Sequence, residues 1–164
     1  MKPLLLALLL LLPFQQSDFG IVSKYDRFKD ETSYRVTESL MPDRRGYVIL
    51  SFLTTFKGEH PLLNRPATVT MLLRSYTEEW YFQDTDNTVR MIQDGQRYEL
   101  GKMSIGRSDV VNNGVIEQLV LEVPFAAVER IGRAKKLEMQ IGRYEVELKP
   151  ETLQNIRTWA ESFK

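Results

Sequence analysis

The fold is decided by residues Thr68–Met103, which read TVTMLLRSYTEEWYFQDTDNTVRMIQDGQRYELGKM. Thr68–Tyr76 is rich in β-branched and aromatic residues and too short for an amphipathic helix, so it predicts a strand. Thr88–Gln93 and Gln96–Leu100 flank Asp94-Gly95. An Asp-Gly pair accepts the positive φ angles of a type I′ turn. The two flanking segments and this pair therefore predict a β-hairpin.

The two strands of this hairpin are expected to have one buried face and one wet face. Polar and apolar side chains alternate along Val89–Ile92 and again along Arg97–Leu100. Successive side chains of a strand point to opposite faces, so this alternation is typical of an antiparallel sheet with one solvated side. The hairpin therefore indicates the middle of an antiparallel sheet.

The rest of the chain shows the same short strand-like segments. Tyr47–Phe56 is apolar on both faces and is expected to be central and covered on both sides. We interpret Lys57–Pro66 and Gly101–Asn113 as polar connections, with Asn112-Asn113 able to close another hairpin. The further predicted strands are Phe19–Tyr25, Glu31–Leu40, Val115–Val123, Lys136–Ile141 and Tyr144–Leu148.

Two helices are predicted near the end of the chain. Pro124–Ile131 has helical spacing of apolar residues, and Gly132 follows where a C-cap is expected. Pro150–Phe163 has an apolar stripe, with Trp159 on its flank. The stripe consists of Leu153, Ile156, Ala160 and Phe163. We therefore predict a mainly β (α+β) fold: an antiparallel β-sandwich or curved sheet of about nine short strands, with a short helix and a C-terminal helix.

Residues 1–17 are interpreted as a cleavable signal peptide, which leaves a single β-rich domain from 18 to 164. Met1-Lys2 gives a positive start, and Leu4–Leu12 is apolar and ends at Pro13. Because a membrane span needs about 20 apolar residues, this run is too short to cross a bilayer. An uncleaved tether is the alternative. The protein is therefore expected to be exported, to the periplasm or outside the cell, without a stable membrane span after signal removal.

Composition excludes several classes of function. The 164 residues carry 22 Lys and Arg against 22 Asp and Glu, and they include no Cys. Zero net charge without a basic stripe argues against nucleic-acid binding. Without cysteine there is no thiolate metal site, cysteine nucleophile or disulfide, and a cysteine-free exported domain must rely on burial for its stability.

The order of these elements resembles that of uncharacterised secreted bacterial β-rich domain proteins with no assigned function. The resemblance implies an exported β-rich domain and carries over no catalytic residue. It is carried by Tyr25–Asp30, Ser75–Trp80, Asp94-Gly95 and Ile141–Leu148.

His60 and the segment Asp84–Asn87 are the first candidates for chemistry. His60 is the sole histidine and has no nucleophile motif beside it, so a solvated loop residue is favoured. Asp84–Asn87 resembles the start of a calcium loop, but Val89 and Gly95 stand where an EF-hand has Gly and Glu. Turn hydrogen bonding accounts for these residues adequately.

Acidic and aromatic clusters are the remaining candidates. Glu78 and Glu79 are adjacent and would point to opposite faces of a strand, whereas Glu145 and Glu147 would share a wet face. Trp80–Phe82 fits core packing better than an exposed aromatic platform for sugars or a partner. The sequence thus assigns no catalytic, cofactor-binding or metal-ligating residue and implies no cofactor.

Three functions stay open, in this order. The first is an exported non-enzymatic binding or interaction module for an unknown protein or small molecule. The second is a carrier of a small apolar ligand, and the third is a carboxylate-based hydrolase that uses some of Glu78, Glu79, Asp84 and Asp86. The carrier hypothesis rests on flexible apolar residues that suit an adaptable cavity. These residues are Phe52, Phe56, Met71, Met91, Met103 and Met139.

Overall fold

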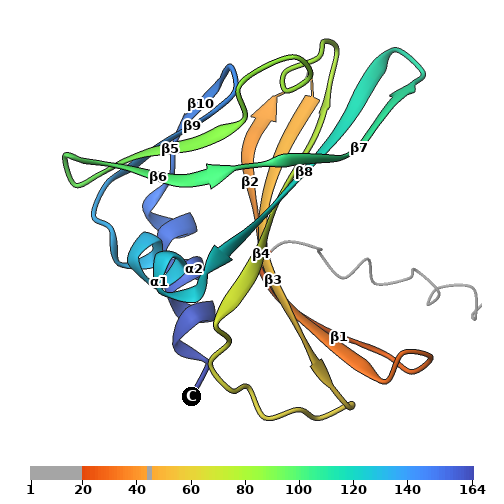
Figure 1. Ribbon diagram of the computed structural model, residues 1–164, viewed down its shortest axis with the longest axis vertical. Coiled ribbons are helices and arrows are strands. Elements are labelled where there is room, and N and C mark those ends of the chain that lie inside the picture. The colour runs from red at the N-terminus through yellow and green to blue at the C-terminus, as the bar shows by residue number, and fades with distance from the viewer. Residues whose placement is uncertain (1–19, 44–45) are drawn as a thin grey trace, which may run out of the picture.

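The computed structural model describes residues 20–43 and 46–164, which form two antiparallel sheets and two helices (Figure 1). The large sheet has the order β1-β2-β3-β4-β8-β7, and the small sheet has the order β10-β9-β5-β6. The strands of the large sheet are β1 (Gly20–Asp26), β2 (Glu31–Asp43), β3 (Gly46–Lys57), β4 (Thr68–Thr77), β7 (Ser104–Val111) and β8 (Gly114–Pro124). Those of the small sheet are β5 (Thr88–Gln93), β6 (Gln96–Lys102), β9 (Leu137–Ile141) and β10 (Tyr144–Glu147).

The predicted mainly β fold with a C-terminal helix is confirmed, and so is its central hairpin. β5 and β6 join at Asp94-Gly95, with φ angles of 50° and 85°, as a type I′ turn requires. Gly142, with φ of 58°, begins the turn between β9 and β10. Local turn chemistry therefore sets the register of both hairpins of the small sheet.

The segment Gly101–Asn113 was wrongly predicted as a polar connection. Gly101 and Lys102 still belong to β6, and Ser104–Val111 forms the edge strand β7. The hairpin at Asn112-Asn113 is confirmed, since Val111 pairs with Gly114. The polar composition of β7 reflects its place at a sheet edge, where side chains stay in water. The described residues thus form ten strands, one more than expected.

β3 is central in the large sheet, as predicted, with β2 and β4 as its neighbours. The small sheet and both helices lie on the same side of the large sheet (Figure 1). Val48, Leu50 and Phe52 face them and are at most 2% exposed, whereas Ile49 and Leu53 point to the other side and are half-buried. Among the described elements, β3 is therefore covered on one side only and not on both as expected, because the small sheet and both helices lie on the same side of the large sheet (Figure 1).

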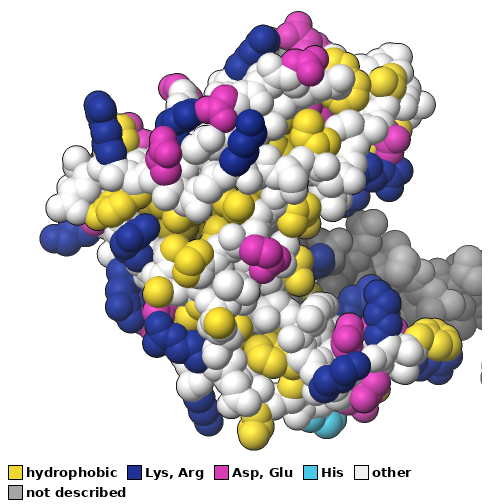
Figure 2. Space-filling view, viewed as in Figure 1, with side chains coloured by type: hydrophobic (Ala, Val, Ile, Leu, Met, Phe, Trp, Pro, Cys, Tyr) yellow, Lys and Arg dark blue, Asp and Glu magenta, His cyan; other side chains and the backbone are white. Residues whose placement is uncertain are grey.

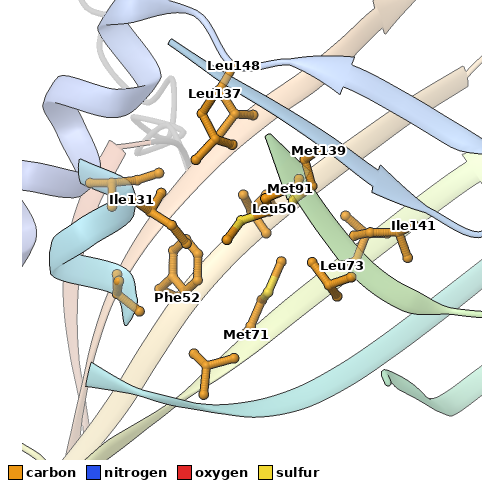
Figure 3. Close-up of a cluster of buried hydrophobic side chains, with 14 of the residues drawn as sticks. Leu50, Phe52, Met71, Leu73, Met91, Ile131, Leu137, Met139, Ile141 and Leu148 are labelled. Carbon is orange, nitrogen blue, oxygen red and sulfur yellow. The ribbon is translucent and has the colours of Figure 1, made fainter. Parts of the chain in front are cut away.

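The core lies between the two sheets and continues beneath the helices (Figure 3). Figure 3 shows Leu50, Phe52 and Met71 from the large sheet pointing towards Met91 and Met139 from the small sheet, alongside Ile131. Side chains from both sheets interdigitate, which is how a sandwich buries its alternating apolar residues. Burial of this surface is the main source of stability in a chain without disulfides.

The two helices pack against each other and close one end of the sandwich. α1 (Phe125–Arg133) runs past Gly132, which was wrongly predicted as its C-cap. A Cβ at Gly132 would lie 2.8 Å from the Arg157 backbone, so glycine is needed there for close helix packing. α2 (Pro150–Glu161) buries Trp159 completely, which corrects its expected place on the flank of the stripe.

Residues 1–17, interpreted as a signal peptide, lie outside the described residues. Within the described residues, neither helix is long and apolar enough to cross a membrane.

Candidate functional site

A groove of about 710 Å³ runs over the small sheet, whose strands alternate core and surface residues. The strand register arranges the surface residues in two rows. Glu145, Gln140, Arg90 and Glu99 form one row, and the other is formed by Glu147, Glu138, Ile92 and Arg97. The lining consists of Arg90, Met91, Ile92, Arg97, Tyr98, Glu99, Glu138, Met139, Gln140, Glu145, Val146 and Glu147.

The side of the groove formed by β9 and β10 is acidic. Glu138 and Glu147 are direct cross-strand neighbours, and the Lys136 ammonium lies 2.7 Å and 3.4 Å from their carboxylates. Like charges at opposed positions repel, and the lysine offsets that repulsion. Hydrogen bonds to Glu138 and then to Glu147 raise the pKa of Lys136. Glu145, whose carboxylate accepts a 2.6 Å hydrogen bond from Gln140 Nε2, adds a further negative charge to this side.

The side formed by β5 and β6 carries two arginines, Arg90 and Arg97, beside the carboxylates of Asp86 and Glu99. Arg90 Nη2 lies 2.5 Å from the Asp86 carboxylate, and Arg90 Nε lies 3.3 Å from that of Glu99. The Asp86 carboxylate accepts hydrogen bonds from Arg90 and from Thr88, and these bonds lower the pKa of Asp86 to about 2. Arg97 stands in the second row, across the strand pair from Ile92. Acidic and basic side chains are interspersed over the small sheet in the upper left of the view (Figure 2).

An apolar residue separates the two charged sides. Ile92 is 37% exposed, with Glu138 opposite it on β9 and Arg97 opposite it on β6. Tyr98, on the core-facing side of β6, is covered by the Arg130 guanidinium, 4.2 Å from the ring centre. The groove thus presents an excess of carboxylates on one side, Ile92 in the centre and, on the other side, Arg97, which forms no ion pair within the described residues.

A buried carboxylate holds the loop that leads into this site. Glu117 of β8 is 0% exposed. Its oxygens accept hydrogen bonds from the backbone N–H groups of Tyr81 (2.9 Å), Phe82 (3.1 Å) and Gln83 (2.9 Å). Buried charge is tolerated when hydrogen bonds satisfy it in this way. Glu117 therefore fixes the loop between β4 and β5 that carries Asp86.

The same loop contacts the hairpin at the end of the small sheet. The buried Asn87 side chain donates to the Phe82 carbonyl at 2.9 Å and accepts from the Thr85 hydroxyl at 2.9 Å. A Cβ at Gly142 would lie 2.7 Å from the Thr85 hydroxyl and 3.0 Å from Asn87 Oδ1. The β9–β10 turn therefore depends on glycine both for its φ of 58° and for this close approach.

Tyr144, at the start of β10, supplies a prediction of pH dependence. Burial, and secondarily the charge of Tyr81, raise the pKa of Tyr144 to about 12. Because folding raises this pKa, Tyr144 makes its full contribution to the free energy of unfolding below about pH 10, the pKa of tyrosine in the unfolded chain. That contribution is lost as the pH rises towards 12. Between about pH 9 and about pH 11.5, the free energy of unfolding of the Tyr144→Phe protein should therefore fall less than that of the unmodified protein. Urea unfolding at both pH values measures the difference. Equal losses in both proteins would contradict the assignment.

The acidic residues proposed for a hydrolase do not converge. Glu78, Glu79, Asp84 and Asp86 are all exposed along the loop, and Asp86 is paired with Arg90. Glu78 and Glu79 follow the end of β4 rather than lying on a strand. Within the described residues, no group of three or more acidic or histidine side chains is placed to hold a metal ion.

Of the other candidates from the sequence, Glu145 and Glu147 line the groove, whereas His60 and Trp80–Phe82 do not. Glu145 and Glu147 share the exposed face of β10, as predicted, and border the groove. Phe82 is fully buried and Trp80 half-buried, so core packing is confirmed for Phe82. His60 is exposed in the loop before β4. The residues named for an apolar cavity, except half-buried Phe56, are at most 3% exposed and packed in the core; they are Phe52, Met71, Met91, Met103 and Met139.

Sequence reasoning missed two residues that define the site. Glu117 occupies a core-facing position in the alternation of Val115, Leu119 and Val123, and a carboxylate at such a position is itself a signal of a specific partner. Arg90 gave no local signal, because its place beside the acidic strands depends on the pairing of β5 with β9.

The groove combines charged side chains with one exposed apolar residue, Ile92. Its charges, except that of Arg97, are paired with neighbours and open to solvent, and it can offer ion pairs at both sides and an apolar contact in the centre. Comparisons with known protein families, with curated proteins and with solved structures found no match for this chain.

Proposed function

We propose that this protein is an exported, non-enzymatic binding module whose ligand lies in the groove over β5, β6, β9 and β10. The observation that supports it is the placement of Glu138 and Glu147 on one side of the groove and of Arg97, an arginine without an ion pair within the described residues, on the other. A volume of about 710 Å³ lies within the usual size of ligand sites.

The ligand class follows from this arrangement. A cationic group of the ligand would face the acidic side, an anionic group would face Arg97, and an apolar part would cover Ile92. A charged segment of peptide carries all three kinds of group. Complementary potentials of this kind give specificity and salt-dependent association.

The first test uses short capped peptides that contain one Lys and one Asp with an apolar residue between them. We expect shifts of backbone amide signals confined to the small sheet, with an affinity that falls as salt rises. An all-alanine peptide of the same length should not bind. Shifts elsewhere, or none at millimolar peptide, would contradict the proposal, as would turnover of ester, peptide or glycoside substrates.

Charge reversal in the groove tests the recognition itself. Arg97→Glu should weaken binding by about tenfold or more, because it places a repelling carboxylate beside the anionic group of the peptide. Lys57→Glu is the matched control, since Lys57 is an exposed cation at the end of β3, outside the groove lining. An equal loss of affinity in both variants would show that only net charge matters.

A further inference from the structure

The outer edge of β7 is the most exposed strand edge of the large sheet. Among the described strands, β7 is the last in the order and pairs only with β8 (Figure 1). Five consecutive residues from Ser104 to Ser108 are exposed, and Ile105 and Val110 are 45% and 71% exposed. Its backbone N–H and C=O groups directed away from β8 are free to pair with another strand.

Two opposite charges lie on this edge, one on each side of Ser108. Arg107 and Asp109 flank Ser108, and Arg107 Nε lies 2.5 Å from the Asp109 carboxylate. Both point to the outer face, opposite Gln118 and Ile116 of β8. Neither side chain forms an ion pair with any other described residue, so this pair can rearrange without breaking another ion pair.

We propose that this edge binds a second copy of the same chain, as an antiparallel β7–β7 contact centred on Ser108. In that register Arg107 lies opposite Asp109 of the second copy, and Asp109 lies opposite its Arg107. Opposed residues of antiparallel strands share a face, so both new pairs form on the outer side. A twofold contact of this kind closes as a dimer, because it uses the β7 edge of both copies.

The charges also exclude the neighbouring registers. A twofold axis at Asp109 would oppose two aspartates, and an axis at Arg107 would oppose two arginines. Like charges at opposed positions destabilise strand pairing. The bulge between Ile105 and Arg107 limits regular pairing on that side, so the contact is small and the dimer readily reversible.

β6 carries the same order of charges but is less free to pair. Arg97 and Glu99 flank Tyr98 as Arg107 and Asp109 flank Ser108. Glu99, however, is bound to Arg90 of β5, and Arg130 of α1 covers the Tyr98 ring.

The other two edge strands are unsuited to self-pairing for different reasons. β10 carries Glu145 and Glu147, which would repel their copies across a twofold axis at Val146. β1 has opposite charges at Lys24 and Asp26, but Asp26 ends the strand and accepts a 2.9 Å hydrogen bond from the Phe28 N–H in the turn. These two edges therefore lack a strand-length register with opposed charges.

Sedimentation equilibrium of the purified protein up to roughly 0.5 mM tests the proposal, and we expect a monomer–dimer equilibrium. Arg107→Asp and Asp109→Arg should each raise the dissociation constant by about tenfold or more, because like charges then oppose each other. An equimolar mixture of the two variants should regain near-native association, since two arginines then face two aspartates.

Arg97→Glu is the matched control and should leave the dimer unchanged, because it makes the corresponding charge reversal on β6. Four results would overturn the proposal. They are a monomer throughout the concentration range, a dimer indifferent to both β7 variants, a mixture that fails to associate, and a dimer lost on Arg97→Glu.

Discussion

Glu117→Gln is expected to lower the free energy of unfolding by about 3 kcal/mol. The side chain is 0% exposed, and its carboxylate accepts from three backbone N–H groups at Tyr81–Gln83. Glutamine has about the same volume as glutamate but carries no charge. Its amide replaces one carboxylate oxygen by an NH₂ group, which would face the backbone N–H groups that the oxygen had accepted from. Buried N–H groups without a partner carry a desolvation penalty, and bonds to charged groups are the stronger ones.

Urea unfolding of both proteins measures this loss, and amide exchange locates it. The protection of the Tyr81–Gln83 amides should fall more than that of β3. Glu122→Gln is the matched control on the same strand, since Glu122 is exposed and points to the outer face. We expect that control to change stability by less than about 0.5 kcal/mol. A Glu117→Gln protein as stable as the control would contradict the structural role.

Trp159→Ala is expected to cost about 4 kcal/mol, because it removes the largest fully buried side chain. The indole contacts the rings of Tyr34, Phe125 and Phe163, with ring centres 6.0, 6.2 and 4.9 Å away. It therefore joins α2 to the large sheet and to α1. A loss of this size is a large share of the stability of a typical domain.

Two further variants separate packing from other effects. Trp159→Phe should cost well under half as much as alanine, because it keeps an aromatic ring and removes an indole N–H that has no hydrogen-bond partner among the described residues. Thr158→Ala, at an exposed neighbouring position, should be nearly neutral. A Trp159→Ala protein with unchanged urea midpoint would show that the aromatic cluster is not needed.

The pattern of local residues was enough to predict most elements. Asp94-Gly95 sets a two-residue turn by its own backbone preferences, and alternation along β5 and β6 sets which faces are wet. The alternation of polar and apolar residues did not identify the strand Ser104–Val111, because the composition of a solvated edge strand resembles that of a loop. It also failed at Gly132, where the neighbouring helix and not the local sequence requires glycine.

The candidate site was less accessible to such reasoning. Glu145 and Glu147 were recognised as a wet strand face, but their basic counterpart was not. Arg90 comes close to them only because β9 pairs with β5, about 50 residues earlier in the chain. The role of Glu117 likewise depends on a loop more than 30 residues away.

The sequence by itself thus determined the class of fold, the hairpins and the terminal helix, because these depend on turn preferences and on periodicity within a few residues. Only the tertiary structure decided which strands became neighbours. Long-range strand pairing brought the acidic strands of the groove beside Arg90 and Arg97 and placed β7 at an open edge. It also buried a carboxylate against three backbone amides, a contact that no local pattern specifies.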